Sequence, residues 1–255
     1  MRLNNSSIHL WQADQADYSA EQLQAECLPW LSEKELLRYQ RYQFASSKQE
    51  YLAGQMLIRT VLSEYADAAP SDWEMTQFEN GKPFIAMPEL AEPIHFNLSH
   101  SGDRLVLAVS RHALTGVDIE SIKAKRRIEQ IAVRHFSSAE LEQLSSLGED
   151  EKLLRFYEFW TLKEAYIKAR GTGLKQSLQS FGFELGKSEL EFWFEQAEEP
   201  AEACWQFWQL HAGTDYCLAL ACCPEESQQI NQLRTFQRTS LQSYQEINTK
   251  PVRSS

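Results

Sequence analysis

Three carboxylates and one lysine have the types and spacing of a small ionic site. In GVDIE, residues 116–120, the two-residue period of a strand sends Asp118 and Glu120 to the same face. Farther along, WTLKEAYIK places Glu164 within an otherwise apolar stripe of a helix, and Lys168 follows one turn later. An unpaired buried carboxylate is costly, so Glu164 needs a cation nearby.

The cation that Glu164 needs is either a lysine or a metal ion. A lysine such as Lys168 would make a structural ion pair, whereas Asp118 and Glu120 together with Glu164 could surround a metal. Three carboxylates without histidine or thiolate suit a hard ion, and Mg²⁺ typically takes a few carboxylates, water and substrate phosphates. Taken alone, GVDIE is more typical of a strand with one solvated face.

A phosphate-bearing substrate would also need hydrogen-bond donors, and three stretches offer them. SHSG contains two hydroxyls, an imidazole and a glycine, NGKP contains a lysine, and KEAYIKARGTGL contains further lysines and glycines. Each candidate has a simpler interpretation, such as a turn residue for Lys82 and a helix C-terminal cap for Gly171. The stretches therefore point to phosphate binding only when taken together; their candidate residues are Ser99, His100, Lys82, Lys163, Lys168, Gly171 and Gly173.

Composition bounds the class of protein. The chain has 255 residues, 43% of them hydrophobic and 24% charged, which is enough to bury a full core. A formal net charge of −11 argues against nucleic-acid or anionic-membrane partners, because counterion release needs a basic face. Neither a long apolar run nor a signal or transit segment is present, so we expect a cytoplasmic protein.

The five cysteines are odd in number and include no Cys-x-x-Cys pair. A disulfide framework and a zinc site are both disfavoured by this pattern. We expect the thiols to be small apolar core residues; they are Cys27, Cys204, Cys217, Cys222 and Cys223.

The elements that must position these side chains alternate between helical and strand patterns. Apolar spacing predicts helices over 32–44 and 46–66, with Ser46 or Ser47 capping the second, and over 138–147 and 150–170. Strands are predicted at 95–98 and 104–110, separated by the polar loop SHSGD, and the second is expected to form a hairpin with GVDIE. Four later stretches also predict strands, namely FGFELG, LEFWFEQ, WQFWQL and YCLALAC. The mixture predicts an α+β fold, followed by a polar tail at 228–255 that we expect to pack loosely.

Five motifs occur in a recognisable order. NGKP, FNLSHSG, GVDIE, HFSSAE and FWTLKEAYIKARGTGL resemble the successive motifs of phosphopantetheinyl transferases of the surfactin-synthetase-activating type, and the resemblance covers roughly residues 31–185. It implies a monomer of two similar α+β halves related by a pseudo-twofold axis, residues 1–112 and 113–227, with coenzyme A held in the cleft between them.

The resemblance also implies roles for individual residues. Asp118, Glu120 and Glu164 would hold Mg²⁺, with Mn²⁺ as an alternative. The residues that would contact coenzyme A are Lys82, Ser99, His100, Lys168, Arg38 and Arg41. Lys168 and His100 would stabilise developing negative charge, and Glu164 would accept the proton of the attacking serine. Glu140 matches a family position, but Ser137 and Glu140 are equally typical of a helix capping box.

The implied reaction transfers the phosphopantetheine arm of coenzyme A to a serine of an apo acyl or peptidyl carrier protein and releases adenosine 3′,5′-bisphosphate. A non-catalytic carrier-protein-binding module is the alternative. A serine hydrolase is disfavoured, because NLSHS lacks the G-x-S-x-G nucleophile elbow. The basic stretch KAKRR is a candidate docking surface for an acidic carrier; it comprises Lys123, Lys125, Arg126 and Arg127.

The sequence departs from the family pattern just before the glycine of the second predicted helix. The basic residue usual there is not plain, and Lys48, Gln49 and Glu50 stand in its neighbourhood.

Overall fold

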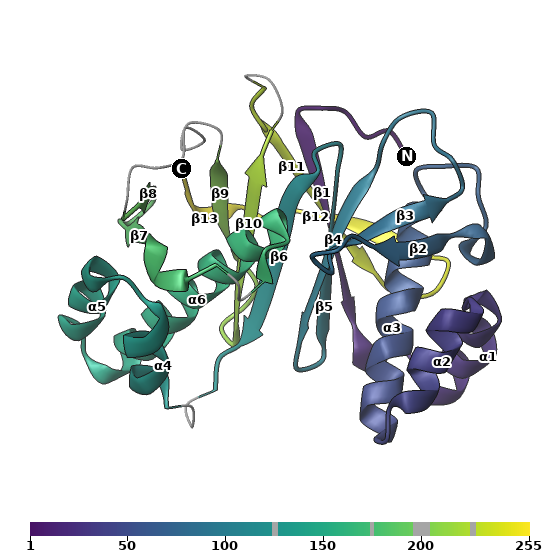
Figure 1. The fold of residues 1–255 in the computed structure, drawn as a ribbon, viewed down its shortest axis with the longest axis horizontal. Helices are drawn as coiled ribbons and strands as arrows, with labels where there is room; N and C mark the ends of the chain where they lie inside the picture. Colours follow the sequence, from purple (N-terminus) through teal and green to yellow (C-terminus); the bar gives the residue numbers. More distant parts are fainter. Residues whose placement is uncertain (124–126, 174–175, 196–204, 225–227) are drawn as a thin grey trace. The chain divides into compact units, whose positions relative to one another are not determined.

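The chain divides into two compact units in a computed structural model, which describes residues 1–123, 127–173, 176–195, 205–224 and 228–255. Unit 1 comprises Met1–Arg111 and Asn231–Asn248, and unit 2 comprises His112–Ile230 and Thr249–Ser255. Each unit contains sheets and helices of its own, which confirms the predicted α+β class (Figure 1).

Unit 1 is a five-stranded sheet with three helices and a small hairpin. The strand order is β12-β11-β1-β5-β4, in which β1 is parallel to β11 and antiparallel to β5. Figure 1 shows α1 and α2 beside α3. The elements are β1 (Ser7–Asp14), α1 (Ala20–Cys27), α2 (Glu33–Arg41), α3 (Ala45–Leu62), β2 (Glu74–Gln77), β3 (Pro83–Met87), β4 (His95–Ser101), β5 (Arg104–Ser110), β11 (Gln232–Arg238) and β12 (Tyr244–Ile247).

The core of unit 1 lies between the sheet and α3. This helix buries every residue from Leu52 to Leu62 except Gln55, and the alternating apolar residues of β1 and β5 pack against it. Full burial of a leucine, isoleucine, valine or methionine side chain stabilises the unit by roughly 1.5–3 kcal/mol. The burial holds α3 against the sheet. The residues at the N-terminal end of α3, which line a surface pocket, therefore extend from a fixed backbone.

Unit 2 wraps a four-stranded sheet and a two-stranded sheet around one long helix. The order of the larger sheet is β13-β9-β10-β6. The long helix, α6, packs against β6 and β10 and buries aromatic residues such as Phe156, Tyr157 and Phe159. The elements are β6 (Leu114–Ser121), α4 (Ile128–His135), α5 (Ser138–Ser145), α6 (Glu149–Arg170), β7 (Phe181–Leu185), β8 (Leu190–Phe194), β9 (Gln206–His211), β10 (Tyr216–Cys223) and β13 (Pro251–Ser254).

The predicted helices and four late strands are confirmed, with small differences at their ends. α6 ends as predicted at Gly171, whose φ of 68° caps the helix in the left-handed conformation. The predicted serine cap of α3 is wrong: the helix begins at Ala45 and follows Phe44, which makes no side-chain cap bond. Ser46 and Ser47 therefore lie within the first turn rather than before it.

The predicted hairpin between 104–110 and GVDIE is also wrong. β5 pairs with β4 on one side and with β1 on the other, so it has no open edge for a third strand. β6, which contains GVDIE, pairs instead with β10. The polar loop expected at SHSGD is shorter than predicted, because β4 continues to Ser101 and only Gly102 and Asp103 form the turn.

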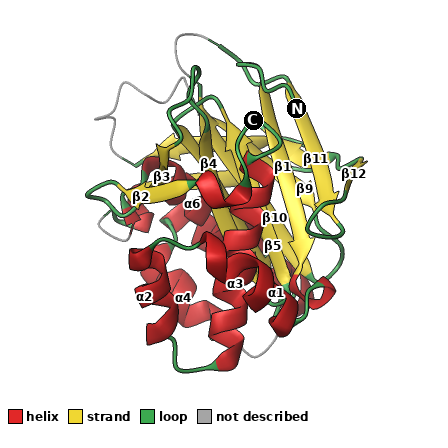
Figure 2. Cartoon of the chain, turned by 90° about the vertical axis from the view of Figure 1, so that its right-hand side faces the viewer, coloured by secondary structure: helices red, strands yellow, loops and turns green. Residues whose placement is uncertain are grey.

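The C-terminal residues are ordered strands, which contradicts the expectation of a loosely packed tail. β11 runs parallel beside β1 in unit 1 (Figure 2), and β13 pairs with β9 in unit 2. Phe236 of β11 is buried and stacks on Trp11, with 4.6 Å between ring centroids. A polar composition gave no apolar period to detect, but backbone pairing with an existing strand needs none.

Cys27, Cys217 and Cys222 are buried free thiols, as predicted. Cys223 is instead disulfide-bonded, which contradicts the expectation of a free thiol at this position. Cys204 lies outside the described residues. None of the described helices combines the length and the apolar character needed to cross a membrane.

Candidate functional site

The contact between β6 and α6 is set by Gly116, the first residue of GVDIE. A Cβ at this position would overlap the Ala165 carbonyl and the Ala169 backbone. Only glycine therefore lets the strand lie directly on the helix. The consequence is that residues later in β6 come within side-chain reach of the next turns of α6.

Asp118 and Lys168 make that contact. Lys168 Nζ lies 2.6 Å from Asp118 Oδ1, and the side chain of Asp118 is 6% exposed. Glu164 lies one helical turn before Lys168 and is half-buried. Burial raises the pKa of Glu164 to about 7; the charge of Asp118 and then that of Glu120 contribute to the rise, and Lys168 opposes it. The three predicted carboxylates and the lysine thus interact electrostatically within unit 2.

The donor set of this cluster suits a hard divalent cation. Mutual repulsion among Asp118, Glu120 and Glu164 is part of what raises the pKa of Glu164, and a cation would relieve it. Among the residues that the structure describes, no three acidic, histidine or cysteine side chains already form a metal-binding group. Lys168 forms an ion pair with Asp118, whereas the hypothesis from the sequence paired this lysine with Glu164. Both hypotheses for Glu164, the lysine partner and the metal, stay predictions.

Lys163, considered above as a phosphate donor, has a structural role. Its ammonium is fully buried, lies 2.8 Å from Glu140 Oε2 and donates to the carbonyls of Leu178 and Phe181. Glu140 also accepts from the backbone N–H of Ser137, whose hydroxyl accepts from Glu140 N, so the capping-box interpretation is confirmed. A lysine with three buried carboxyl or carbonyl oxygens around it has no donor left for a substrate.

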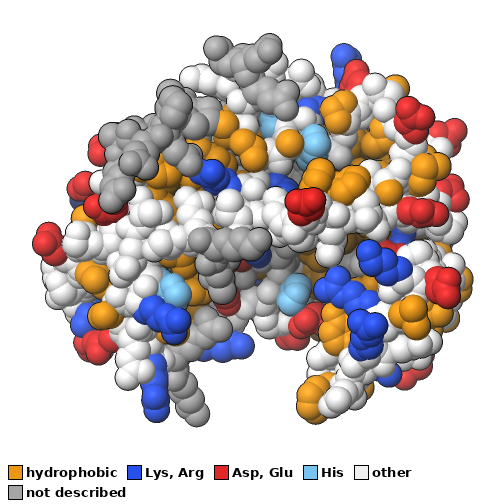
Figure 3. All heavy atoms as spheres, in the orientation of Figure 1, with side chains coloured by type: hydrophobic (Ala, Val, Ile, Leu, Met, Phe, Trp, Pro, Cys, Tyr) orange, Lys and Arg blue, Asp and Glu red, His pale blue; other side chains and the backbone are white. Residues whose placement is uncertain are grey.

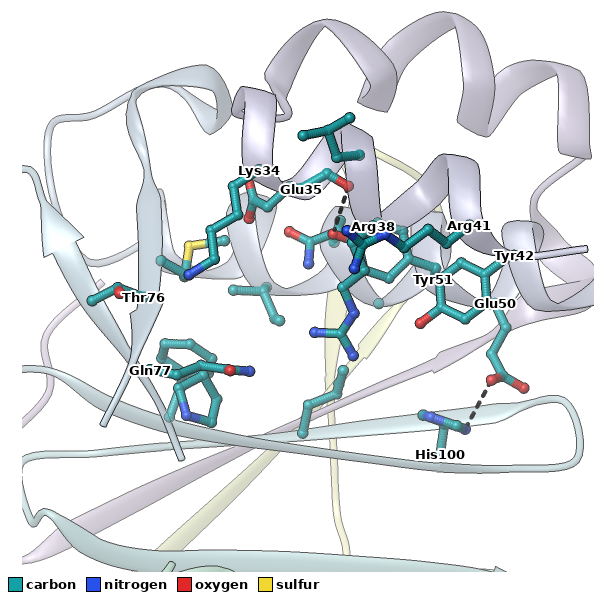
Figure 4. Close-up of a pocket in the computed structure, with 18 of the residues that line it drawn as sticks. Lys34, Glu35, Arg38, Arg41, Tyr42, Glu50, Tyr51, Thr76, Gln77 and His100 are labelled. Atoms are coloured by element: carbon teal, nitrogen blue, oxygen red, sulfur yellow. Dashed lines mark hydrogen bonds and ion pairs between the residues drawn. The ribbon is translucent and has the colours of Figure 1, made fainter. Parts of the chain in front are cut away.

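Unit 1 contains a pocket of about 570 Å³ between α2, α3 and the strands β2, β3 and β4 (Figure 4). α3 approaches β4 closely at Gly54, where a Cβ would lie 3.1 Å from Leu98 Cδ2. The apolar part of the lining includes Ile58, Met75, Pro83, Phe96 and Leu98.

The polar lining of this pocket is rich in cations. Lys34, Arg38 and Arg41 extend from α2, and the Arg38 guanidinium lies 5.6 Å from the centre of the Tyr51 ring. Figure 3 shows Lys and Arg side chains gathered on this face of unit 1. No described acid forms an ion pair with Lys34, Arg38 or Arg41. The pocket is therefore suited to an anionic ligand with an apolar or aromatic part.

A buried ion pair holds α2 in place. Glu35 closes a capping box with Ser32 and also accepts from Arg59 of α3 at 2.7 Å. Arg59 is fully buried and also donates to the Trp73 carbonyl. Since these contacts fix the first turn of α2 onto α3, the cations of α2 extend from a fixed backbone.

The predicted coenzyme A contacts are distributed as follows. Arg38, Arg41 and His100 all line the unit 1 pocket. Lys82 follows the Asn80–Gly81 turn and is not among the described lining residues, although Pro83 beside it is. Ser99 is buried and also outside the lining, as expected for a strand neighbour of His100. Lys168 belongs to the cluster in unit 2.

Sequence reasoning missed some lining residues. Lys34 stands four residues before Arg38 and seven before Arg41, so helical spacing alone could have added it. Glu50, noted only as a departure from the family pattern, lies 3.7 Å from His100 Nδ1 through its Oε1 atom. No sequence signal could have found that contact, because the two residues lie on different elements.

The basic docking stretch KAKRR is only partly visible. Lys125 and Arg126 lie outside the described residues. The backbone N–H of Lys123 donates to the Tyr157 hydroxyl, and Arg127 immediately precedes α4. Docking at this stretch stays a prediction.

Two family models match this chain. A family model described as the 4′-phosphopantetheinyl transferase superfamily matches residues 115–221, which include the whole carboxylate–lysine cluster. A second, described as the N-terminal part of a 4′-phosphopantetheinyl transferase, matches residues 10–112, which include every residue lining the pocket.

Individual relatives match across most of their length. The chain is 32% identical over 176 residues to the 4′-phosphopantetheinyl transferase HetI of Nostoc sp., covering 68% of this chain and 73% of that protein. It is 34% identical over 158 residues to the 4′-phosphopantetheinyl transferase Sfp of Bacillus subtilis, covering 62% and 68%. The chain belongs to the phosphopantetheinyl transferase family, and the predicted resemblance to its surfactin-synthetase-activating members is confirmed.

A solved structure also matches part of the chain. The Helicobacter pylori holo-[acyl-carrier-protein] synthase, determined in complex with coenzyme A, is 14% identical, with a TM-score of 0.31. The match covers 40% of this chain and 97% of that protein.

Proposed function

We propose that this phosphopantetheinyl transferase uses Mg²⁺ to transfer the phosphopantetheine arm of coenzyme A to a serine of an apo acyl or peptidyl carrier protein, releasing adenosine 3′,5′-bisphosphate. The serine oxygen forms a bond to the β-phosphorus of the coenzyme A diphosphate. The bond from that phosphorus to the bridging oxygen breaks, and the electron pair leaves with the nucleotide. The serine proton passes to a base.

The carboxylate–lysine cluster of unit 2 supports this proposal most directly. Asp118, Glu120 and Glu164 would hold Mg²⁺, which when bound neutralises diphosphate charge. Glu164 is the proposed base, directly or through water, because it is the carboxylate of the cluster that lies on α6 one helical turn before Lys168. Lys168, now 2.6 Å from Asp118, would donate to the diphosphate and stabilise charge that develops on the leaving oxygen.

The unit 1 pocket supports binding of the nucleotide portion. Its apolar lining suits an adenine base, and Lys34, Arg38, Arg41 and His100 offer positive charge and donors to a phosphate. The expectation that coenzyme A is held between the two halves stays a prediction, as does the contribution of Lys82 and Ser99.

The decisive experiment is intact-mass spectrometry of an apo acyl carrier protein after incubation with the enzyme, coenzyme A and Mg²⁺. We expect a gain equal to one phosphopantetheine group, and none when EDTA replaces the metal. Asp118→Asn should abolish the gain, whereas the matched exposed variant Asp67→Asn should retain it.

Two results would overturn the proposal. One is the absence of any gain on several unrelated carriers with folded enzyme, which would favour a non-catalytic carrier-protein-binding module. The other is full activity of Asp118→Asn, which would remove the carboxylate cluster from the reaction.

A further inference from the structure

Glu50 places a negative charge in a pocket whose other unneutralised groups are cations. The pocket lining contains two acids, and the first, Glu35, is neutralised by the buried Arg59. The second, Glu50, lies with its Oε1 atom 3.7 Å from His100 Nδ1. Figure 4 shows this pair at one side of the pocket, with Glu50 extending from α3 toward His100 on β4.

The geometry makes this contact easy to exchange. The side chains of His100 and Glu50 are 45% and 43% exposed, so water can replace either partner. A separation of 3.7 Å is longer than a hydrogen bond, and a half-exposed contact of this kind contributes little to folding stability. The contact between Glu50 and His100 therefore does not stabilise the fold as the buried ion pair of Glu35 and Arg59 does.

An anion that reached His100 would meet Glu50 as well. The imidazole has one edge toward the Glu50 carboxylate, and a phosphate that approaches the same ring comes within a few ångströms of a like charge. Either the Glu50 side chain turns away into solvent or the phosphate binds more weakly. Both alternatives lower the affinity for the anion relative to a pocket with a neutral side chain at this position.

We propose that Glu50 is an affinity-setting residue of the unit 1 pocket: its carboxylate pairs with His100 in the ligand-free protein and competes with the ligand phosphate for that imidazole. The ligand phosphate is that of the nucleotide portion of coenzyme A, so the inference rests on the proposed function. Weak binding of that portion is useful to a transferase, because the released adenosine 3′,5′-bisphosphate carries the same group and must leave before the next turnover.

The test is calorimetric titration of adenosine 3′,5′-bisphosphate into the full chain, without carrier protein. Glu50→Gln keeps the size of the side chain and removes its charge, and we expect it to bind about 3- to 10-fold more tightly than the wild type. The gain should shrink at 0.5 M salt, where a Debye length of roughly 4 Å screens half-exposed charges. Glu26→Gln, an exposed change on α1, is the matched control and should leave affinity unchanged.

Repeating the measurement in the His100→Gln variant separates competition between Glu50 and the phosphate for His100 from simple repulsion between Glu50 and the phosphate. If Glu50 acts by occupying His100, the gain from Glu50→Gln should fall to less than about twofold when His100→Gln is already present. An equal gain in both backgrounds would overturn the competition.

The outcomes also separate this inference from the proposed function. A wild type that binds the bisphosphate, with no gain in Glu50→Gln, would overturn the role of Glu50 alone. A wild type that binds neither the bisphosphate nor coenzyme A would overturn nucleotide binding by the pocket, and the role of Glu50 with it.

Discussion

The two units stabilise a short helix in the same way and use the result differently. In unit 1, Ser32 and Glu35 form a capping box whose carboxylate takes Arg59 of α3. In unit 2, Ser137 and Glu140 form a capping box whose carboxylate takes Lys163 of α6. In each unit, the capping box and its ion pair join the start of a short helix to the long helix, although the two stretches show no clear sequence repeat.

The surroundings of the two ion pairs differ. Glu140 and Lys163 are both fully buried, whereas the Glu35 side chain is 12% exposed and lines the pocket. The residues proposed to bind or react with the substrate are sequence neighbours of these ion-paired residues. Lys34 precedes Glu35, and Glu164 follows Lys163. A lysine or glutamate of a motif can therefore stabilise the scaffold while its sequence neighbour belongs to the proposed site.

Breaking the ion pair of unit 2 should have the largest effect on stability. Lys163→Met leaves the buried carboxylate of Glu140 without its cation, and we expect a loss of about 3–5 kcal/mol in the free energy of unfolding. Arg59→Met should cost about 1–2 kcal/mol less, because water can reach Glu35 in part. Urea unfolding, with hydrogen exchange to assign the loss to a unit, measures both.

A double variant controls for lost packing. Glu140→Gln combined with Lys163→Met removes both charges, so it should be more stable than Lys163→Met alone. If the two were equally stable, the cost would come from packing of the lysine stem rather than from the uncompensated charge.

A histidine in each unit sharpens the comparison through pH. Burial lowers the pKa of His9 in unit 1 to about 4, where its Nδ1 lies 2.8 Å from the Tyr65 hydroxyl. The pKa of His9 is lower in the folded protein than in the unfolded chain. The contribution of His9 to the free energy of unfolding is therefore fully present above about pH 6.5 and is lost as pH falls toward 4. The free energy of unfolding should therefore change by about 3 kcal/mol less over that pH range in His9→Gln than in the wild type.

His135 of unit 2 is the matched comparison. Burial also lowers its pKa, but the side chain remains half-exposed against Trp160. His135→Gln should change the slope of unfolding free energy against pH far less than His9→Gln. Equal slopes for the two variants would contradict the assignment of the acid sensitivity to His9.

The smallest effects should come from the glycines that set helix–strand contacts. Gly116→Ala forces β6 away from the backbone of α6, and we expect a loss of about 2 kcal/mol together with reduced transfer activity. Gly54→Ala meets only the flexible end of Leu98, and the better helix propensity of alanine offsets the contact, so its net effect should stay within about 1 kcal/mol.

Thermal unfolding and the mass-spectrometric transfer assay measure both variants. Gly148→Ala, where no atom lies within 4 Å of the added methyl group, is the control. A larger loss for Gly54→Ala than for Gly116→Ala would reverse the proposed order of tightness between the two contacts.

Most of the helices and the position of the ionic site could be predicted because their signals are local. The period of α6 and its glycine cap fixed both ends of that helix within a residue or two. The spacing in GVDIE placed both carboxylates on one face of a strand. The tail could not be predicted, since β11 has little apolar period and depends on the edge of β1.

By itself, the sequence determined the family, the α+β class and the residue types of the site, because ordered motifs and apolar periods are properties of neighbouring residues. Only the tertiary structure decided which charges meet. It separated Lys163, buried on Glu140, from Lys168 at Asp118, and it brought Glu50 to His100. Those pairings join residues of different elements, and their energies depend on burial and distance, which no spacing along the chain encodes.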